Sequence, residues 1–358
     1  MPQEDPLRQT QMDAFVTRTK RPIEVVEASK KKQRIKEEEE VKEEIATSSE
    51  TQTYSKHWTY PIDILNPSFR IEDGLSSQEG SNIRKHGDLD LLYFSPFLKK
   101  DYAQQLYLHL LNNMPWYRVT YTVGARTIRT PRWTTVFGLD DTAEFEPPEE
   151  DGTVAGRGVR PKKGGKLPAK TYKNDPRPLP LLLSQLKKLV EEKTGAEYNF
   201  CLLNLYLDGK DSISYHSDDE GFLGENPTIA SMSLGSTRTF LFKQKEKDDG
   251  VAYAGNKNKN KKGKGVGKGP VEKFQLNSGD LIVMRSTTQR NWLHSIPKTT
   301  TTVGPRINIT FRKAMNVKGT NNYYHFNVHA ALKDSGENEA HRYSEGNMVK
   351  WKGVVDEE

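Results

Sequence analysis

Two histidines and one aspartate have the residue types and spacing to hold a metal ion. His216 and Asp218 lie two positions apart in an extended segment, where their side chains project to one side with Cα atoms about 6–7 Å apart. His294 lies in a second strand-like segment, residues 292–295. Two imidazoles and a carboxylate form the facial set of non-haem iron, which leaves three positions open. Zinc accepts the same ligands, so the triad alone does not choose the metal.

A second segment carries arginines on one face of a strand. Residues 306–312 alternate between an apolar row and a polar row, and the polar row consists of Arg306, Asn308, Thr310 and Arg312. An inward-facing guanidinium group is costly unless an anion neutralises it. The two arginines are about 20 Å apart at Cα, and their long side chains leave a gap suited to a short dicarboxylate. Taken alone, the pattern fits equally well arginines that reach solvent at the two strand ends.

A third polar pair lies on the strand at residues 200–207. Its odd-numbered positions form an apolar face, whereas Asn204 and Tyr206 share the other face with Phe200 and Leu202. An inward-facing Asn and Tyr need hydrogen-bond partners. Those partners are either neighbouring backbone or a bound polar ligand.

The elements that position these residues are helices followed by strands. Ser95-Pro96 predicts a helix start, with a buried stripe at Leu98, Tyr102, Leu106 and Leu110. Residues 117–137 read as strands around Gly124, and a second helix follows from about Leu182 to Gly195. Residues 198–314 then read as short strands separated by turns. We expect an α+β fold with an antiparallel core.

The composition predicts one folded domain with long tails. The chain is 34% hydrophobic and 28% charged, too polar for all of its 358 residues to pack in a globule. We expect a disordered arm at 1–85, a domain at 86–316 with its strand core at about 198–314, and a tail at 317–358. A Lys/Gly-rich insert at 243–273 is predicted to be the exposed tip of a hairpin.

Charge and cysteine content narrow the function classes. The net charge of +6 and a pI near 9.0 suit a polyanionic partner such as nucleic acid. The single cysteine, Cys201, excludes an internal disulfide framework and fits a reducing compartment. No run of 18 apolar residues and no apolar stretch near Met1 is present. We therefore expect a soluble protein that is neither secreted nor membrane-bound.

The arm carries two short motifs. A basic cluster at residues 30–36 precedes four glutamates and is interpreted as a nuclear import signal, which predicts a nuclear location. A solvated tail fits the same residues. Gln9, Met12 and Phe15 resemble the sliding-clamp-binding box, because a helical turn would place Met12 and Phe15 on one side as an apolar plug. Val16 stands where that box usually has a second aromatic.

Several segments together resemble the AlkB family of dioxygenases, and are most similar to its DNA-repair subgroup. They run in order over residues 199–313 and read NFCLLNLYLDGKDSISYHSDDE, ASMSLGSTRTFLFK, SGDLIVM, NWLHSIP and PRINITFRK, with a weaker upstream match, PRWTTVFG. The resemblance implies a double-stranded β-helix (jelly-roll) core that uses Fe(II) with 2-oxoglutarate as cosubstrate. It identifies the iron ligands as His216, Asp218 and His294, and the cosubstrate contacts as Asn204, Tyr206, Arg306 and Arg312.

The same resemblance suggests how a damaged base is held. Glu220 aligns with an acid that meets the exocyclic amine of the base, and Asp219 lies beside it. Tyr172 corresponds to an aromatic that stacks on the flipped base. The duplex-specialised member of the subgroup has an intercalating aromatic before a hairpin glycine, whereas this chain has Val123 before Gly124. That departure puts a strong preference for duplexes in doubt.

The function implied is oxidative removal of methyl groups from adenine N1 or cytosine N3 in DNA, with release of formaldehyde and succinate. A methyl group there blocks pairing, which makes the base cheaper to extrude. Three alternatives stay open: an RNA demethylase, a hydroxylase of proteins or small molecules, and a nucleic-acid-binding scaffold without turnover. Clamp binding favours DNA, the acidic pair disfavours the second alternative, and the complete ligand set disfavours the third.

Overall fold

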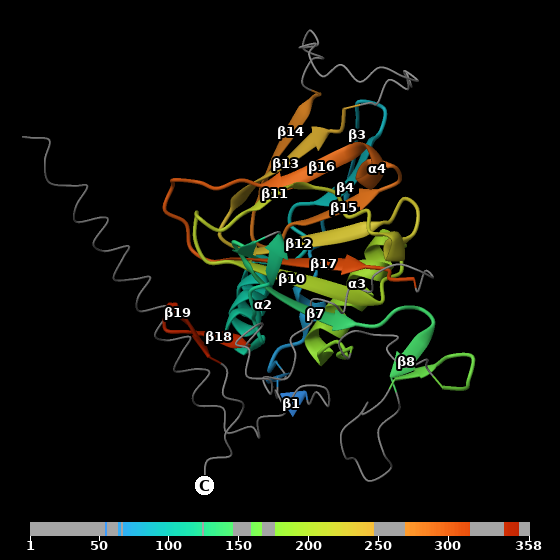
Figure 1. Cartoon of the computed structure of the whole chain (residues 1–358), viewed down its shortest axis with the longest axis vertical. Helices are drawn as coiled ribbons and strands as arrows, with labels where there is room; N and C mark the ends of the chain where they lie inside the picture. Colours follow the sequence, from blue (N-terminus) through green and yellow to red (C-terminus); the bar gives the residue numbers. More distant parts are fainter. Residues whose placement is uncertain are drawn as a thin grey trace, which may run out of the picture. The chain divides into compact units, whose positions relative to one another are not determined.

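The polar rows predicted from the sequence lie between two antiparallel sheets. The computed structural model describes residues 54–55, 64–65, 67–123, 125–145, 159–166, 176–246, 269–315 and 340–350. Figure 1 shows the smaller sheet above the long strands of the larger one, with helix α2 (Lys100–Asn113) below them. Helices and antiparallel sheets confirm the expected α+β class.

The larger sheet has seven strands, and its centre is built from distant parts of the chain. Its order is β3 (Ser81–Lys85), β4 (Leu89–Phe94), β15 (Leu281–Arg285), β12 (Ile229–Gly235), β17 (Arg306–Arg312), β10 (Phe200–Tyr206) and β7 (Trp133–Gly138). Strand β17 pairs with β12 on one side and with β10 on the other, so Tyr206 lies opposite Arg306. The arginine-bearing strand is therefore fixed on both edges.

The smaller sheet has four strands and carries both histidines of the predicted triad. Its order is β11 (Ile213–His216), β16 (Trp292–Ile296), β13 (Arg238–Gln244) and β14 (Val271–Leu276). A short helix, α4 (Thr288–Asn291), leads into β16. Strands β13 and β14 form the hairpin expected at the base of the insert, with Lys243 opposite Val271. Residues 247–268 lie outside the described residues.

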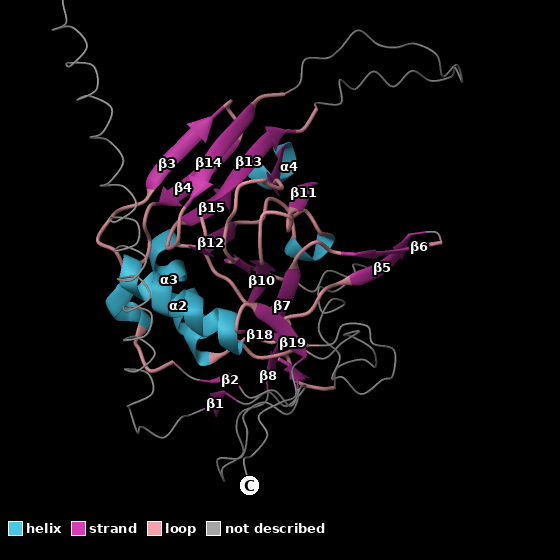
Figure 2. Cartoon of the chain, turned by 90° about the vertical axis from the view of Figure 1, so that its left-hand side faces the viewer, coloured by secondary structure: helices cyan, strands magenta, loops and turns pink. Residues whose placement is uncertain are grey.

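Smaller two-stranded elements surround the sheets. They are β1 (Tyr54–Ser55) with β2 (Ile64–Leu65), β5 (Thr120–Val123) with β6 (Arg126–Arg129), β8 (Ala143–Phe145) with β9 (Val159–Pro161), and β18 (His341–Ser344) with β19 (Asn347–Lys350). Figure 2 shows the β5–β6 hairpin projecting from the body of the protein. No helix among the described residues is long and apolar enough to cross a membrane.

One hydrophobic core lies between the helices and the outer face of the larger sheet. Leu106 and Leu110 of α2 and Leu186 of α3 (Leu181–Thr194) pack in the same cluster as Leu203 and Ile309. Burying side chains of this size contributes about 1.5–3 kcal/mol each. Helix α3 ends as predicted at Gly195, whose φ of 68° suits a residue without Cβ.

A second core fills the space between the sheets. Phe200 and Ile282 of the larger sheet pack there with Phe240, Phe242 and Trp292 of the smaller one. The alternation predicted for residues 200–207 is thus confirmed, because the odd-numbered side chains enter the first core and the even-numbered ones the second. The polar row of β17 is fully buried as well.

The predicted start of helix α2 is wrong by several residues. The helix begins at Lys100, after Lys99, which makes no side-chain capping bond. The hydroxyl of Ser95 does not cap a helix; it donates to Asp280 Oδ1 at 3.0 Å. The Ser95 hydroxyl, which the local Ser-Pro motif predicted to cap a helix, is thus bonded to a residue far away in sequence.

Described residues on both sides of the expected domain also contact it. The arm was expected to extend to residue 85, yet β3 pairs with β4, and Ile71 in the 3₁₀ helix η2 (Ile71–Gly74) is fully buried. The tail was expected to begin at residue 317, and within it His341 exchanges backbone hydrogen bonds with Trp116 at 2.6 and 2.7 Å. The clamp-like residues 9–16 and the basic cluster lie outside the described residues.

Candidate iron and 2-oxoglutarate site

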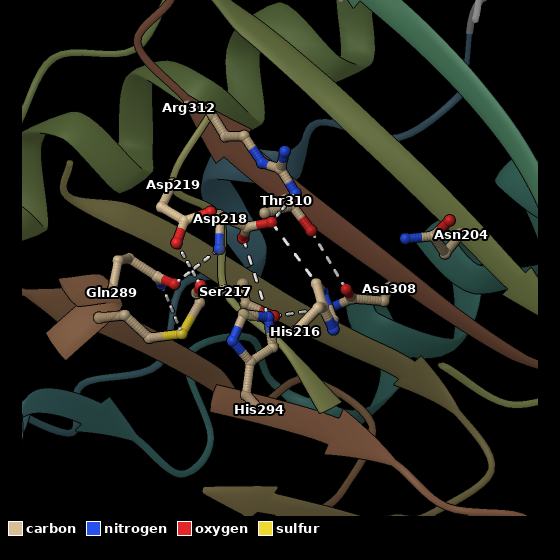
Figure 3. A network of polar contacts seen from close by, with 12 residues as sticks. Asn204, His216, Ser217, Asp218, Asp219, Gln289, His294, Asn308, Thr310 and Arg312 are labelled. Atoms are coloured by element: carbon tan, nitrogen blue, oxygen red, sulfur yellow. Dashed lines mark hydrogen bonds and ion pairs between the residues drawn. The ribbon is translucent and has the colours of Figure 1, made fainter. Parts of the chain in front are cut away.

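The register of the smaller sheet brings the predicted triad together. His216 ends β11 directly opposite His294 on β16, and the ring centroids lie 4.1 Å apart. Asp218 follows two residues later, with carboxylate oxygens 4.0 Å from His216 Nε2 and 3.8 Å from His294 Nε2. One ligand atom from each residue lies within 4.8 Å of the other two. Figure 3 shows the three side chains converging.

The protonation states of the triad suit a metal cation. Burial, followed by the neighbouring His216, lowers the pKa of His294 to about 3, so this imidazole is neutral at physiological pH. Burial alone would raise the pKa of Asp218, but its pKa is lowered overall, and the positive charge of Arg312 is the largest lowering influence. A site with one carboxylate and two neutral imidazoles offers a divalent metal ligands that are already deprotonated.

A pocket between the sheets joins the triad to the polar rows. Its lining includes both histidines and Asp218 together with Asn204, Tyr206, Ser231, Asn308, Thr310 and Arg312. The apolar part of its wall comes from Ile213, Phe240, Met284 and Ile296. Polar side chains in a mostly buried wall are the usual construction of a small-molecule site.

Tyr206 in the pocket wall and Arg306, its partner on β17, have buried donors that lack acceptors among the described residues. Arg306 is 1% exposed and donates from Nη2 to Ser233 Oγ at 2.9 Å. Its Nε and Nη1 atoms, and the hydroxyl of the adjacent Tyr206, meet no hydrogen-bond acceptor within the described part of the chain. Burial lowers the pKa of Arg306 to about 10, which still leaves it cationic. A buried cation with unpaired donors fits a carboxylate ligand.

Arg312 occupies the metal end of the same strand. Its Nη2 donates to Asp218 Oδ1 at 2.8 Å, while its Nε has no acceptor among the described residues. The two arginines therefore differ from the symmetrical clamp expected from the sequence. Arg306 lies beside the pocket-lining Tyr206 and pairs with no carboxylate of the described residues. Arg312 pairs with the metal-ligand carboxylate of Asp218 (Figure 3).

Asn204 lies in the pocket wall with partners that sequence reasoning missed. Its side-chain oxygen accepts a hydrogen bond from Thr134 Oγ1 at 2.6 Å and one from Arg132 Nε at 3.2 Å. Arg132 and Thr134 are two residues apart at the start of β7, which pairs with β10. Because residues two apart in a strand share a face, their spacing in PRWTTVFG could have predicted that both point to the same side.

Two of the residues assigned to the base pocket, Asp219 and Glu220, directly follow the metal ligand Asp218 in the chain. Asp219 is exposed and accepts hydrogen bonds at Oδ2 from Ser217 Oγ at 2.6 Å and Lys245 Nζ at 3.1 Å. Glu220 is exposed and immediately precedes the 3₁₀ helix η3 (Gly221–Leu223). Tyr172 lies outside the described residues. The structure thus places the acidic pair beside the triad, with Asp219 already bonded to two protein donors.

Gln289 and Phe240 support the metal ligands. Gln289 of α4 accepts the backbone N–H of Asp218 at Oε1 over 2.9 Å, and its Nε2 donates to Met284 Sδ at 3.1 Å. The Phe240 ring stacks on the His294 ring at 5.5 Å and 20°. Nothing in the local sequence marks either residue, because both contacts join segments distant in the chain.

Replacing Gln289 with alanine is expected to lower metal affinity by about 10–100-fold. The change leaves the buried N–H of Asp218 without its acceptor, so the orientation of the Asp218 carboxylate is no longer fixed. Titration of the protein with Mn(II), followed by calorimetry, measures the effect. Gln275→Ala is the matched control, since Gln275 is exposed on β14 and bonds only to Thr239 in the described structure. Equal Mn(II) affinity in the two variants would contradict the role assigned to Gln289.

Comparisons with known proteins agree with this site. The model of the 2OG-Fe(II) oxygenase superfamily matches residues 90–312. Human "Alpha-ketoglutarate-dependent dioxygenase alkB homolog 3" is 38% identical over 131 residues, which are 37% of this chain and 42% of that protein. The Arabidopsis thaliana "DNA oxidative demethylase ALKBH2" is 32% identical over 230 residues, or 63% of this chain and 67% of that one.

A solved structure titled "The structure of OsALKBH1" aligns with 65% of this chain and 99% of its own, at a TM-score of 0.39 and 17% identity. The chain spans less than half the length of the human relative and two thirds of the plant one. The superfamily match covers both strands that carry the triad histidines and the arginine-bearing strand β17. The chain belongs to the 2OG-Fe(II) oxygenase superfamily, among its AlkB-like members, and the Fe(II) of that family fits the triad of His216, Asp218 and His294.

Proposed function

We propose that this protein is an oxidative demethylase of N-alkylated bases in DNA, of the 1-methyladenine and 3-methylcytosine type, built on a double-stranded β-helix core. The observation that carries the proposal is a pocket that joins the His/Asp/His triad to Tyr206, whose ring lies 5.4 Å from Arg306, a buried arginine with unpaired donors. The similarity to proteins named DNA oxidative demethylase supports nucleic acid as the substrate class.

The protein side chains have separate tasks in this proposal. Arg306 and Tyr206 bind the distal carboxylate of 2-oxoglutarate, because their buried donors have no other acceptor in the described structure. Burial raises the pKa of Tyr206, which keeps its hydroxyl protonated and able to donate. Asn204 and Arg312 line the remainder of the cosubstrate pocket. The triad holds Fe(II).

Fe(II) and 2-oxoglutarate, when bound, would activate O2, so that one oxygen atom hydroxylates the N-methyl carbon and the other enters succinate as the cosubstrate loses CO2. The hydroxymethyl group then leaves the base nitrogen as formaldehyde. Asp219 and Glu220 favour binding of a methylated base, because the N-methyl group leaves the ring cationic and both carboxylates directly follow Asp218 in the chain. Phe240, stacked on His294, helps to exclude water from the pocket.

The test is formaldehyde release from defined oligonucleotides. The full-length protein is incubated with Fe(II), 2-oxoglutarate and single- or double-stranded DNA or RNA carrying one methylated base, with His216→Ala as control. The proposal expects release from methylated DNA that depends on His216. Release from RNA alone would make the protein an RNA demethylase. No release from any oligonucleotide, with succinate formed on a protein or small-molecule substrate, would refute nucleic-acid repair.

A nuclear location and binding to a sliding clamp through Gln9, Met12 and Phe15 complete the proposal. Both rest on motifs in the arm. Calorimetric titration of a peptide of residues 1–25 into the purified clamp tests the second, with Phe15→Ala as the control peptide. Identical heats from the two peptides would remove the clamp from the proposal.

A further inference from the structure

Arg238, the first residue of β13, is a buried arginine that the proposed chemistry does not use. It is 3% exposed, and it forms no salt bridge with a described residue. Its guanidinium donates three hydrogen bonds, all to backbone carbonyls: Nη1 to Asp208 O at 2.9 Å, and Nη2 to Asp211 O at 3.0 Å and to Pro297 O at 2.8 Å. A buried cation that bonds only to backbone serves to hold segments in place.

The three carbonyls belong to the two segments that flank the metal-ligand strands. Asp208 and Asp211 lie between Tyr206, at the end of β10, and His216, at the end of β11. Pro297 directly follows β16, the strand of His294. A single guanidinium group therefore ties the segment that leads into one metal ligand to the segment that leaves the other.

The segment from Leu207 to Ser212 is fixed from its other side too. The Asp211 carboxylate accepts the backbone N–H of Leu207 at 2.9 Å and pairs with Arg118 Nη2 at 3.1 Å. The N–H of Ser212 donates to Pro131 O at 2.9 Å. This segment is thus held between Arg238 and the residues that flank the β5–β6 hairpin.

Arg238 also borders the anion-binding end of the pocket. Its guanidinium carbon lies 5.9 Å from the centroid of the Tyr206 ring, and that of Arg306 lies 5.4 Å from the same centroid. The position of Tyr206 therefore depends on the segment that begins immediately after it, which Arg238 clamps. Arg238 thus contacts Tyr206 in the pocket wall and the segments next to the strands of both metal-ligand histidines.

We propose that Arg238 is a positioning residue for 2-oxoglutarate, which sets the separation between the Tyr206–Arg306 end of the pocket and the metal end. This inference rests on the proposed binding of 2-oxoglutarate in this pocket. Arginine suits the role because its planar fork directs several N–H groups at fixed angles, whereas a lysine ammonium is a single point on a flexible stem. The triad itself has further support from the β11–β16 ladder and from Gln289.

The experiment compares cosubstrate binding with metal binding in the full chain. Mn(II) affinity is measured first, and 2-oxoglutarate is then titrated into the Mn(II)-loaded protein by calorimetry. In Arg238→Gln we expect the affinity for 2-oxoglutarate to fall by about 10–100-fold, more than the affinity for Mn(II). Asp211→Asn, a smaller change on the other side of the same segment, is expected to act in the same direction and to fold even where Arg238→Gln does not.

Two further variants separate positioning from other effects. Arg285→Gln removes another arginine clamp, whose Nη2 bonds to Asn82 and Asp90 and which does not line the pocket. It is expected to lower the melting temperature without weakening 2-oxoglutarate binding. Arg238→Lys keeps the charge but loses the fork, so it is expected to resemble Arg238→Gln.

Three results would overturn the inference: unchanged 2-oxoglutarate affinity in both Arg238→Gln and Asp211→Asn, an equal loss in Arg285→Gln, or full affinity in Arg238→Lys, which would mean that charge alone matters. If the natural chain itself binds no 2-oxoglutarate, the proposed function fails, and this inference fails with it. That outcome is distinguishable because it concerns the protein without substitutions.

Discussion

Changing His294 to alanine is expected to abolish metal binding and to lower the proposed demethylation by about 1000-fold or more. The imidazole is 6% exposed and neutral, and it is one of only two nitrogen ligands that the triad provides. A catalytic metal contributes several kcal/mol to a reaction, and about 4 kcal/mol corresponds to a factor of ~1000 in rate. The variant also leaves a gap beside Phe240, which stacks on this ring. A modest loss of thermal stability is therefore expected alongside the loss of metal.

Metal binding and folding must be measured separately for this variant. Calorimetric titration with Mn(II) gives the first, and the thermal unfolding midpoint gives the second. His86→Asn is the matched control, because His86 is an exposed imidazole bonded to Glu272, and asparagine tolerates its φ of 54°. Retention of Mn(II) affinity by His294→Ala within a few fold of the control would show that the triad is not the metal site.

Changing Arg306 to glutamine is expected to affect the cosubstrate and spare the metal. Loss of one partner of a buried charge pair costs about 2–5 kcal/mol, so 2-oxoglutarate affinity should fall by a factor on the order of 10² or more. Mn(II) affinity should be unchanged, since Arg306 lies at the other end of β17 from Arg312, the arginine that pairs with Asp218. The Michaelis constant for 2-oxoglutarate should therefore rise sharply.

The same substitution is expected to raise the stability of the ligand-free protein, or leave it unchanged. Arg306 is buried with two donor nitrogens unpaired, and its removal relieves the desolvation cost of an uncompensated cation. Melting curves with and without 2-oxoglutarate measure both effects: the natural protein should gain stability on adding the ligand, and Arg306→Gln should gain little. A variant that is much less stable without ligand, yet binds 2-oxoglutarate normally, would contradict the anion-binding role.

The chemistry-bearing residues were predictable because their signals are local. His216 and Asp218 lie within one extended segment, and the alternation at residues 306–312 marks a polar row on an otherwise apolar strand. Both patterns depend only on the period of a β-strand. The meeting of His216 with His294 was inferred from residue type, whereas the observed ladder of β11 with β16 gives it a geometric cause.

The features that were missed lack such a local signal. Strand β3 has the sequence SNIRK with only Ile83 partly buried, so this edge strand shows no apolar alternation. Hairpin β18–β19 is similarly polar, yet Tyr343 and Met348 pack against the first core. The Ser95–Asp280 and Arg238–Pro297 contacts join residues far apart in sequence. Such pairings arise from the tertiary fold and cannot be read from periodicity.

The origin of the pocket walls has a consequence for the whole molecule. Both histidines hang from the four-stranded sheet, whereas Tyr206, Arg306 and Arg312 belong to the seven-stranded sheet. A diacid that contacts both sheets would link them. Because it binds only the folded protein, it would stabilise the native state more as its concentration rises. The cellular concentration of this diacid would then influence the lifetime of the protein as well as its turnover rate.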